Sequence, residues 1–454
     1  MTVWVATGLC LQILALLIMH AAIKGRWFRR LGALFLLVAF LYQGGTEVMQ
    51  WIAPGMNPFR ALLTQEQIDA WVILVSLAML AYTIAYVIAA QRSKRVDAEP
   101  SVKAVDGLEL WWLLPLTIPL LAATIQGQGG IGPGSQATRN NYAIGGMSLQ
   151  FLVYLVAVCG VVAIVRLGPK AVLPTLLCQG LLLSLGGTRG LILSTSILSL
   201  YGASMAGIRI PKKPLIIAGA VIALLMVSIS ASRSVDGRES FAANVGVTKR
   251  LSALTDGLGI VATGQGGQAI LQDFVYRFDG NTYGALVLSS LDKGAEPVGL
   301  TTTRNNILLA VPSFLNPNKL DSSLATRDEK AYFENNFGLP MPVDYLQGVF
   351  GTLIGYFGRA GLFLLSGLLG VAFAAADVVI FKNLTSAGLL FGIGVLNGVL
   401  AYEIGPSAFP LTLRGALVLI SLFLTMRWIH ARVIRTRSRP WQGWGPRSWR
   451  QARS

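Results

Sequence analysis

Residues 70–90 read AWVILVSLAMLAYTIAYVIAA, a run without one charged side chain. As an α-helix, a run of this length spans about 30 Å, the thickness of the hydrocarbon core of a bilayer. The whole chain has the same character, because 54% of its residues are hydrophobic, 13% are charged and its mean hydropathy is +0.61. Too little polar surface remains to cover a soluble globule. We therefore expect an integral membrane protein.

Similar apolar runs recur along the chain and predict an all-α, polytopic helical bundle with about eleven transmembrane helices. The runs are residues 3–22, 31–53, 70–90, 110–125, 147–165, 171–186, 191–206, 214–230, 349–375, 386–404 and 411–428. One long polar segment interrupts them. We divide the chain accordingly into an N-terminal bundle of about eight spans, a large helical loop, about three C-terminal spans and a basic tail, at residues 1–231, 232–347, 348–431 and 432–454.

The distribution of basic residues predicts the orientation. No charge precedes the first span, and four basic residues follow it between Lys24 and Arg30, so the N-terminus is expected outside and the C-terminus inside. The long loop then faces the periplasm. Most of the net charge of +16 falls on the inner side, which is an orientation signal and not a nucleic-acid footprint. The arginine- and tryptophan-rich tail from Arg432 is expected to lie on anionic membrane lipids.

The cysteines and histidines exclude several kinds of site. Cys10, Cys159 and Cys178 lie within predicted spans and form no CxxC pair, so we expect neither structural disulfides nor thiol-bound metals. His20 and His430 lie at the inner ends of the first and last spans. An outward-facing site has no imidazole to use, and no cofactor is expected.

Six arginines on the outer side are candidates for binding a diphosphate, because a guanidinium group can hold a phosphate through two hydrogen bonds. They are Arg189, Arg233, Arg238, Arg277, Arg304 and Arg359. Arg189 lies in the turn GGTRG at residues 186–190, where glycines let backbone amides approach a phosphate as well. The alternative is that these arginines are interfacial anchors that reach the lipid headgroups.

The long loop also carries candidates for acid/base chemistry and sugar binding. Two stretches, residues 241–258 and 270–286, have helical apolar spacing and are expected to lie along the outer leaflet or to cap the bundle, with a turn at residues 279–281. Candidate general bases and sugar-stacking rings occur in the same loop. The bases are Asp279, Asp273 and Asp236, and the rings are Tyr276 and Tyr283. An amphipathic helix with an interfacial Tyr-Arg girdle is the alternative.

Two further acids occur near the outer ends of spans. A carboxylate inside a membrane is a functional candidate by default. For Glu47 and Glu403 we nevertheless favour an ion pair with a nearby arginine such as Arg189 or Arg414.

Three features together resemble the bacterial O-antigen and exopolysaccharide repeat-unit polymerases, the Wzy-type family. They are the many spans with one large late periplasmic loop, the GGTRG turn, and GTLIGYFGRAG at residues 351–361, which is similar to the family's aromatic-Phe-Gly-x-x-Gly segment. Such polymerases are similar in design to the GT-C glycosyltransferases.

The resemblance implies a metal-independent, lipid-dependent glycosyltransferase of the bacterial inner membrane. It would polymerise undecaprenyl-diphosphate-linked oligosaccharide repeat units at the periplasmic face, with a chain-length regulator protein as a partner. Arg189, Arg233, Arg277 and Arg304 would contact the diphosphates. O-antigen ligases share the layout but use a loop histidine, and none lies between Arg233 and Gln347. A lipid-linked oligosaccharide flippase or exporter, and a structural scaffold, remain alternatives.

Overall fold

The computed structural model describes most of the predicted helices and part of the long loop. It covers residues 2–55, 57–92, 110, 113, 145–185, 189–236, 246–264, 267, 272, 275, 278–299, 311, 335–339, 348–382, 385–402 and 408–437. Every regular element within these ranges is helical, which confirms the all-α prediction. A helix satisfies all its backbone hydrogen bonds within one segment, as a bilayer requires.

The N-terminal half comprises two series of helices. The first contains α1 (Val3–Ala22), η1 (Trp27–Arg29), α2 (Leu31–Phe40), the π-helical η2 (Leu41–Gly45), α3 (Thr46–Ile52), η3 (Pro58–Leu62) and α4 (Gln65–Arg92). The second contains α7 (Gly145–Leu167), η7 (Pro169–Ala171), α8 (Val172–Ser184), α9 (Arg189–Met205) and α10 (Lys212–Asp236). The polar segment contributes α11 (Val247–Thr263) and α13 (Gly280–Asp292), and the chain ends with α16 (Val349–Lys382), α17 (Ser386–Leu400) and α18 (Ala408–Arg437).

Within the described residues, six helical stretches are long and apolar enough to cross a membrane. They are Val3–Ala22, Leu31–Ile52, Gln65–Arg92, Lys212–Arg233, Val349–Lys382 and Thr412–Arg432. Three shorter apolar helices, Val153–Leu167, Gly190–Met205 and Ser386–Leu400, coincide with other predicted spans. The predicted run at residues 110–125 lies almost wholly outside the described residues, so the number of spans stays a prediction.

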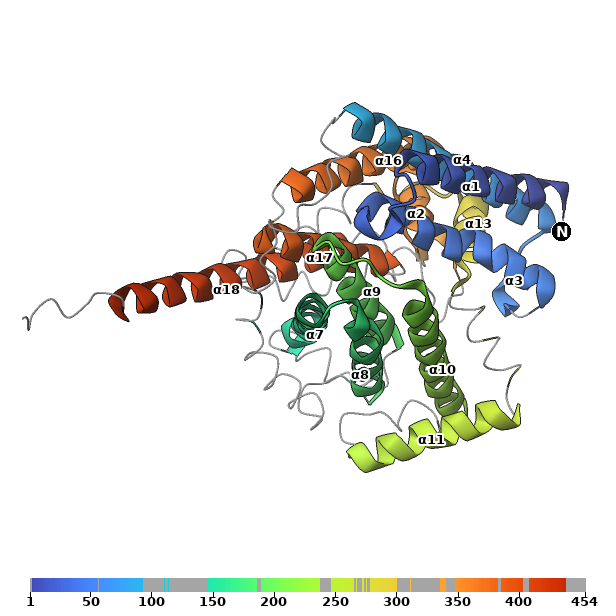
Figure 1. The fold of residues 1–454 in the computed structure, drawn as a ribbon. Coiled ribbons are helices and arrows are strands. Elements are labelled where there is room, and N and C mark those ends of the chain that lie inside the picture. The colour runs from blue at the N-terminus through green and yellow to red at the C-terminus, as the bar shows by residue number, and fades with distance from the viewer. Residues whose placement is uncertain are drawn as a thin grey trace, which may run out of the picture.

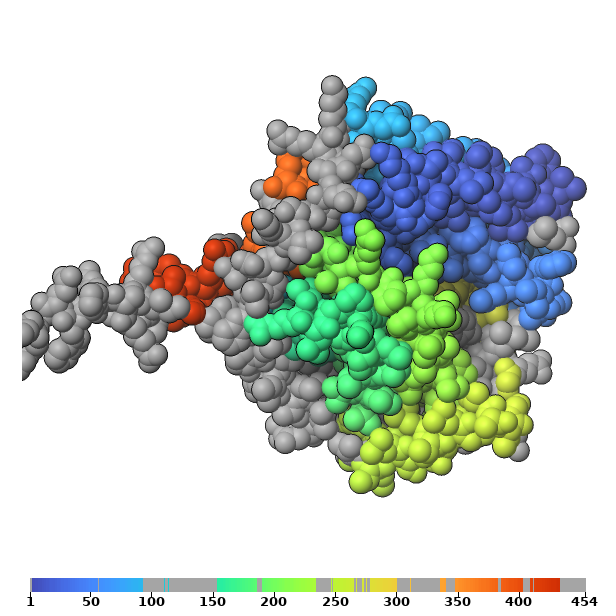
Figure 2. Space-filling view, viewed as in Figure 1, coloured from blue at the N-terminus to red at the C-terminus, as the bar shows by residue number. Residues whose placement is uncertain are grey.

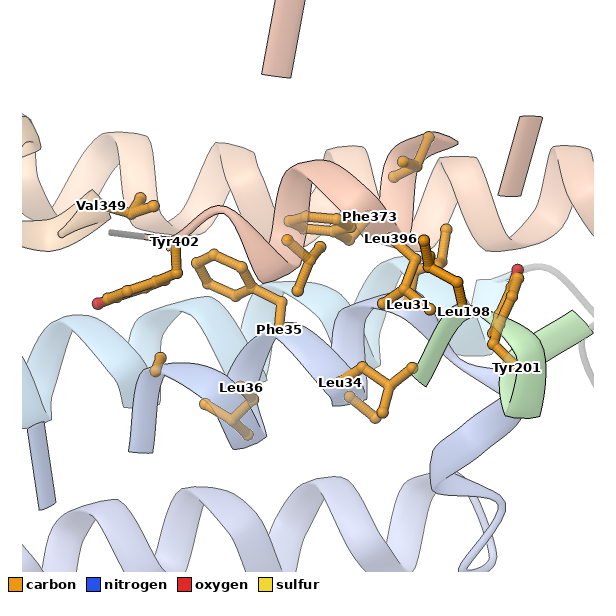
Figure 3. Close-up of a cluster of buried hydrophobic side chains, with 14 of the residues drawn as sticks. Leu31, Leu34, Phe35, Leu36, Leu198, Tyr201, Val349, Phe373, Leu396 and Tyr402 are labelled. Atoms are coloured by element: carbon orange, nitrogen blue, oxygen red, sulfur yellow. The ribbon is translucent and has the colours of Figure 1, made fainter. Parts of the chain in front are cut away.

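The main core lies where α2, α4, α16 and α17 meet. Phe35 of α2 is fully buried, and its ring centroid lies 5.0 Å from that of Tyr82, 5.1 Å from that of Phe373 and 5.9 Å from that of Tyr402. Figure 3 shows Phe35 and Phe373 side by side between these elements. In Figure 1, α1, α4 and α16 run alongside one another. Buried aromatic rings dominate core energetics, so this cluster holds sequence-distant helices together.

A buried carboxylate joins three of these helices at one end of the bundle. Asp377 of α16 accepts a hydrogen bond from the backbone amide of Leu31 at 2.9 Å and from the Tyr86 hydroxyl at 2.6 Å. It thereby caps the N-terminus of α2, where a negative charge is stabilising. At the opposite end, the Thr2 hydroxyl donates to Asp69 at 2.8 Å and links the starts of α1 and α4.

The helix α16 is kinked at Gly358. Gly358 has φ +68°, a left-handed conformation that residues with a Cβ rarely adopt. The carbonyls of Gly355 and Tyr356 before the kink accept hydrogen bonds from the backbone amides of Val298 and Gly299. A Cβ on Gly361 would lie only 2.1 Å from Cβ of Phe357. The two glycines of Phe-Gly-x-x-Gly therefore have a local structural cause.

Helix α11 lies across the end of α10 (Figure 1). Its buried face contains Arg250, Ala253, Leu254 and Gly257, whereas Leu251 is exposed. The helical apolar spacing predicted for residues 241–258 thus places Leu254 but not Leu251 on the buried face. The reason is close packing, since a Cβ on Gly257 would lie 2.2 Å from the Ser228 carbonyl oxygen.

Candidate functional site

The candidate site lies where α13 enters the bundle. Part of the long polar segment, α13 packs against α4 and α16, and nearly all of its residues from Gly280 to Ser289 are buried. Gly284 permits this contact, because a Cβ there would lie 2.1 Å from the Trp71 ring. The prediction that residues 270–286 lie along the leaflet or cap the bundle is thus wrong for α13. It is a core helix, since small residues on it allow α4 to approach.

Asp279 begins α13 and is itself buried, with 2% of its surface exposed. Its carboxylate accepts hydrogen bonds from the Thr282 backbone amide at 2.9 Å, the Thr282 hydroxyl at 2.6 Å and Asn57 Nδ2 at 2.7 Å. Gln50 Nε2 lies 3.5 Å away. The predicted turn at residues 279–281 is therefore a helix start with an aspartate N-cap.

A second buried carboxylate lies beside the first on α3. Arg60 donates two hydrogen bonds to Glu47, from Nη1 to Oε1 at 2.9 Å and from Nη2 to Oε2 at 2.7 Å. Asn281 Nδ2 donates to the same Oε1 at 2.9 Å. The predicted ion pair of Glu47 is confirmed, but its partner is Arg60 and not Arg189 or Arg414. Asn57 caps η3 and positions Arg60 for this contact, since its Oδ1 accepts from the Phe59 amide at 3.0 Å.

The π-helical segment η2 supplies backbone and side-chain acceptors to the same cluster. Asn281 Nδ2 donates to the Gln43 carbonyl at 2.6 Å, and Asn281 Oδ1 accepts from the Trp71 indole at 3.0 Å. Single π-helical turns inside longer helices occur often at functional sites. Gln43 is fully buried, and its side-chain Oε1 has no hydrogen-bond donor within the described part of the chain. Leaving such an acceptor unsatisfied costs about 1–3 kcal/mol.

We call Gln43, Glu47, Arg60, Asp279 and Asn281 the α13 cluster. Its charged groups come from segments more than 200 residues apart. Charged side chains within a membrane bundle are costly to bury and usually functional. The cluster therefore combines two fixed carboxylates, one guanidinium and a buried acceptor.

The arginines predicted to bind a diphosphate are not part of the α13 cluster, and the structure describes only some of them. Arg233 lies half-buried near the end of α10, and Arg189 begins α9, although its side chain is outside the described set. Arg250 on α11 is a buried arginine that our sequence reasoning missed. Its Nη1 donates to the carbonyl of Leu185, directly before the GGTRG turn, at 3.2 Å. Burial lowers the pKa of the Arg250 guanidinium. Its position three and four residues before Ala253 and Leu254 could have revealed it.

Two other predicted site residues, Arg359 and Tyr283, lie on different helices from Arg189, Arg233 and Arg250. Arg359, with 57% of its side chain exposed, forms an ion pair with Asp292 at the end of α13. Tyr283 is 1% exposed and packs beside Gly351 within the core. The Tyr283 ring is therefore surrounded by other side chains of the protein. A contact between Tyr283 and a sugar stays a prediction.

The remaining predicted site residues lie outside the described residues. They are Arg238, Asp273, Tyr276, Arg277 and Arg304, together with Glu403 and the side chain of Asp236. Their roles in substrate binding and catalysis stay predictions.

No protein-family model matches the chain, and no curated protein and no solved structure is significantly similar to it.

Proposed function

We propose that this chain is a bacterial inner-membrane glycosyltransferase that polymerises undecaprenyl-diphosphate-linked oligosaccharide repeat units into O-antigen or exopolysaccharide. In this proposal the chain crosses the membrane about eleven times, with its N-terminus outside and its active site facing the periplasm. The observation that carries the proposal is Asp279: the long polar segment sends α13 back into an apolar bundle and buries this carboxylate beside the Glu47–Arg60 pair.

The proposed reaction uses two groups of residues. The sugar hydroxyl at the non-reducing end of the incoming repeat unit attacks the anomeric carbon of the growing glycan, and the bond from that carbon to the carrier diphosphate breaks. Asp279 accepts the hydroxyl proton, for which the substrate hydroxyl would replace one of the present donors to its carboxylate. Gln43 Oε1 is an acceptor for a further sugar hydroxyl. The diphosphate leaves with its negative charge, which arginines stabilise.

The arginines proposed for the diphosphate are Arg189, Arg233, Arg238, Arg277, Arg304 and Arg359, joined by Arg250. Arg250 supports this assignment best, because its guanidinium lies against the Leu185 carbonyl, directly before the glycine-rich turn in sequence, and Arg233 lies near the end of α10, which packs on α11. Guanidinium groups and backbone amides together suit an anionic phosphate. The undecaprenyl chain would lie in the surrounding bilayer.

Reconstitution of the full chain tests the proposed reaction. Purified protein in vesicles, supplied with a lipid-linked repeat unit and no other protein, should yield a ladder of glycans that differ by one repeat. The products are separated by gel electrophoresis and weighed by mass spectrometry. In a parallel reaction that also contains a lipid A acceptor, transfer of a single glycan to that acceptor without a ladder would instead identify a ligase. Passage of the unchanged unit across the vesicle membrane would identify a flippase.

A further inference from the structure

The helix α18 leaves the bundle before it ends. Its buried residues form one stripe, and none of its described side chains beyond Phe423 is buried. The stripe consists of Thr412, Ala416, Leu419 and Phe423. The remaining turns, to Arg437, extend about 20 Å at 1.5 Å per residue. Figures 1 and 2 show this end of α18 projecting well past the other helices.

The projecting part combines exposed apolar side chains with positive charge. Leu424, Trp428 and Ile429 are about half exposed. The guanidinium carbon of Arg432 lies 4.0 Å from the centroid of the Trp428 ring, a cation–π contact. Tryptophan and arginine together are typical of the level of the lipid headgroups, where one part of each side chain is apolar and the other polar.

The positive charge of the sequence around the end of α18 indicates that this helix binds an anionic surface. Residues 404–454 contain nine arginines and neither aspartate nor glutamate. The apolar span Thr412–Arg432 has the length of a membrane crossing, so its end reaches the headgroups of one leaflet. Basic residues at that level attract anionic lipids.

We propose that the end of α18, with Arg427, Trp428 and Arg432 as its described contacts, is a binding surface for anionic phospholipid headgroups. The two guanidinium groups attract the net negative charge of the headgroup, and the indole ring together with Ile429 lies against the acyl chains. This surface is separate from the α13 cluster, so it holds whether or not the chain is a polymerase.

Native mass spectrometry of the full-length protein tests this surface. The protein in a neutral detergent is titrated with phosphatidylglycerol or with phosphatidylcholine, and the bound lipids are counted. The Arg427→Gln/Arg432→Gln variant is expected to need about 25-fold more phosphatidylglycerol for equal occupancy, or about five-fold for each arginine. Phosphatidylcholine binding should not change. The Arg427→Lys/Arg432→Lys variant should retain most of the preference, because lysine and arginine near the surface attract anionic lipids about equally.

The control variant Lys249→Gln/Lys293→Gln removes two exposed positive charges from α11 and from the residue after α13. It should bind phosphatidylglycerol like the wild type. An equal loss in the control and in the α18 variant would show a general effect of net charge and would overturn the proposal. So would a wild-type protein that binds the two lipids equally well. Circular dichroism of each variant checks that the helices remain folded.

Discussion

Replacing Asp279 with asparagine is expected to lower the rate of glycan polymerisation by about 100-fold or more, because a positioned general base contributes about 10²–10⁴ to a rate. The substitution separates catalysis from folding. Asparagine is about as good an N-cap as aspartate, so it can still accept the hydrogen bond from the Thr282 amide and start α13. The measurement is the initial rate of ladder formation in vesicles, with thermal unfolding of the same preparation.

The matched control is Asp256→Asn on α11. Asp256 is an exposed acid of the same polar segment and accepts a hydrogen bond from the Ser252 hydroxyl at 3.3 Å. The Asp256→Asn variant should polymerise glycan at the wild-type rate. Wild-type activity in Asp279→Asn would restrict Asp279 to helix capping, and the general base would then have to be sought elsewhere in the segment.

The second large effect is expected on stability, at the Glu47–Arg60 pair. Arg60→Gln leaves Glu47, which is 3% exposed, without the guanidinium that neutralises it. Among the described residues, Asn281 is then the side chain that still donates to it. Breaking a buried ion pair by removing one partner costs about 3–5 kcal/mol. Unfolding of the protein in mixed micelles with increasing SDS should show a loss of this size.

An exposed ion pair supplies the control for that loss. Arg359 and Asp292 are each about half exposed, and exposed pairs contribute about 0–1 kcal/mol. Arg359→Gln should therefore unfold almost like the wild type. The double variant Glu47→Gln/Arg60→Gln should recover part of the stability that Arg60→Gln loses, because no unpaired charge remains buried. Equal losses in Arg60→Gln and Arg359→Gln would contradict the buried cluster.

The sequence predicted the helices well, because an apolar run of membrane-spanning length can satisfy its backbone hydrogen bonds in a bilayer as an α-helix and in few other ways. Residues 3–22 and 214–230 match α1 and the central part of α10 closely. It also predicted that Glu47 forms an ion pair. The partner was missed since Arg60 lies in η3, beyond a turn at Gly55, and only the path of that turn brings it back onto α3.

Tertiary packing decided what the sequence pattern left open. Residues 280–292 resemble a surface helix by composition, yet Gly280 and Gly284 let them fit against Gln43 and Trp71 in the core. Arg250 was overlooked because a cation on the buried face of a helix contradicts simple amphipathic patterning. Its spacing from Ala253 and Leu254 was the available signal, and the close packing of Gly257 on α10 explains why that face is buried.

Photo-crosslinking tests most directly whether the α13 cluster is the place where glycan is transferred. A lipid-linked repeat unit that carries a diazirine on its acceptor sugar is irradiated with the full-length protein, and labelled peptides are mapped by mass spectrometry. The account predicts label on residues 43–60 or 272–284, reduced by unlabelled substrate. Label confined to α16–α18 and equally reduced by unlabelled substrate would contradict it.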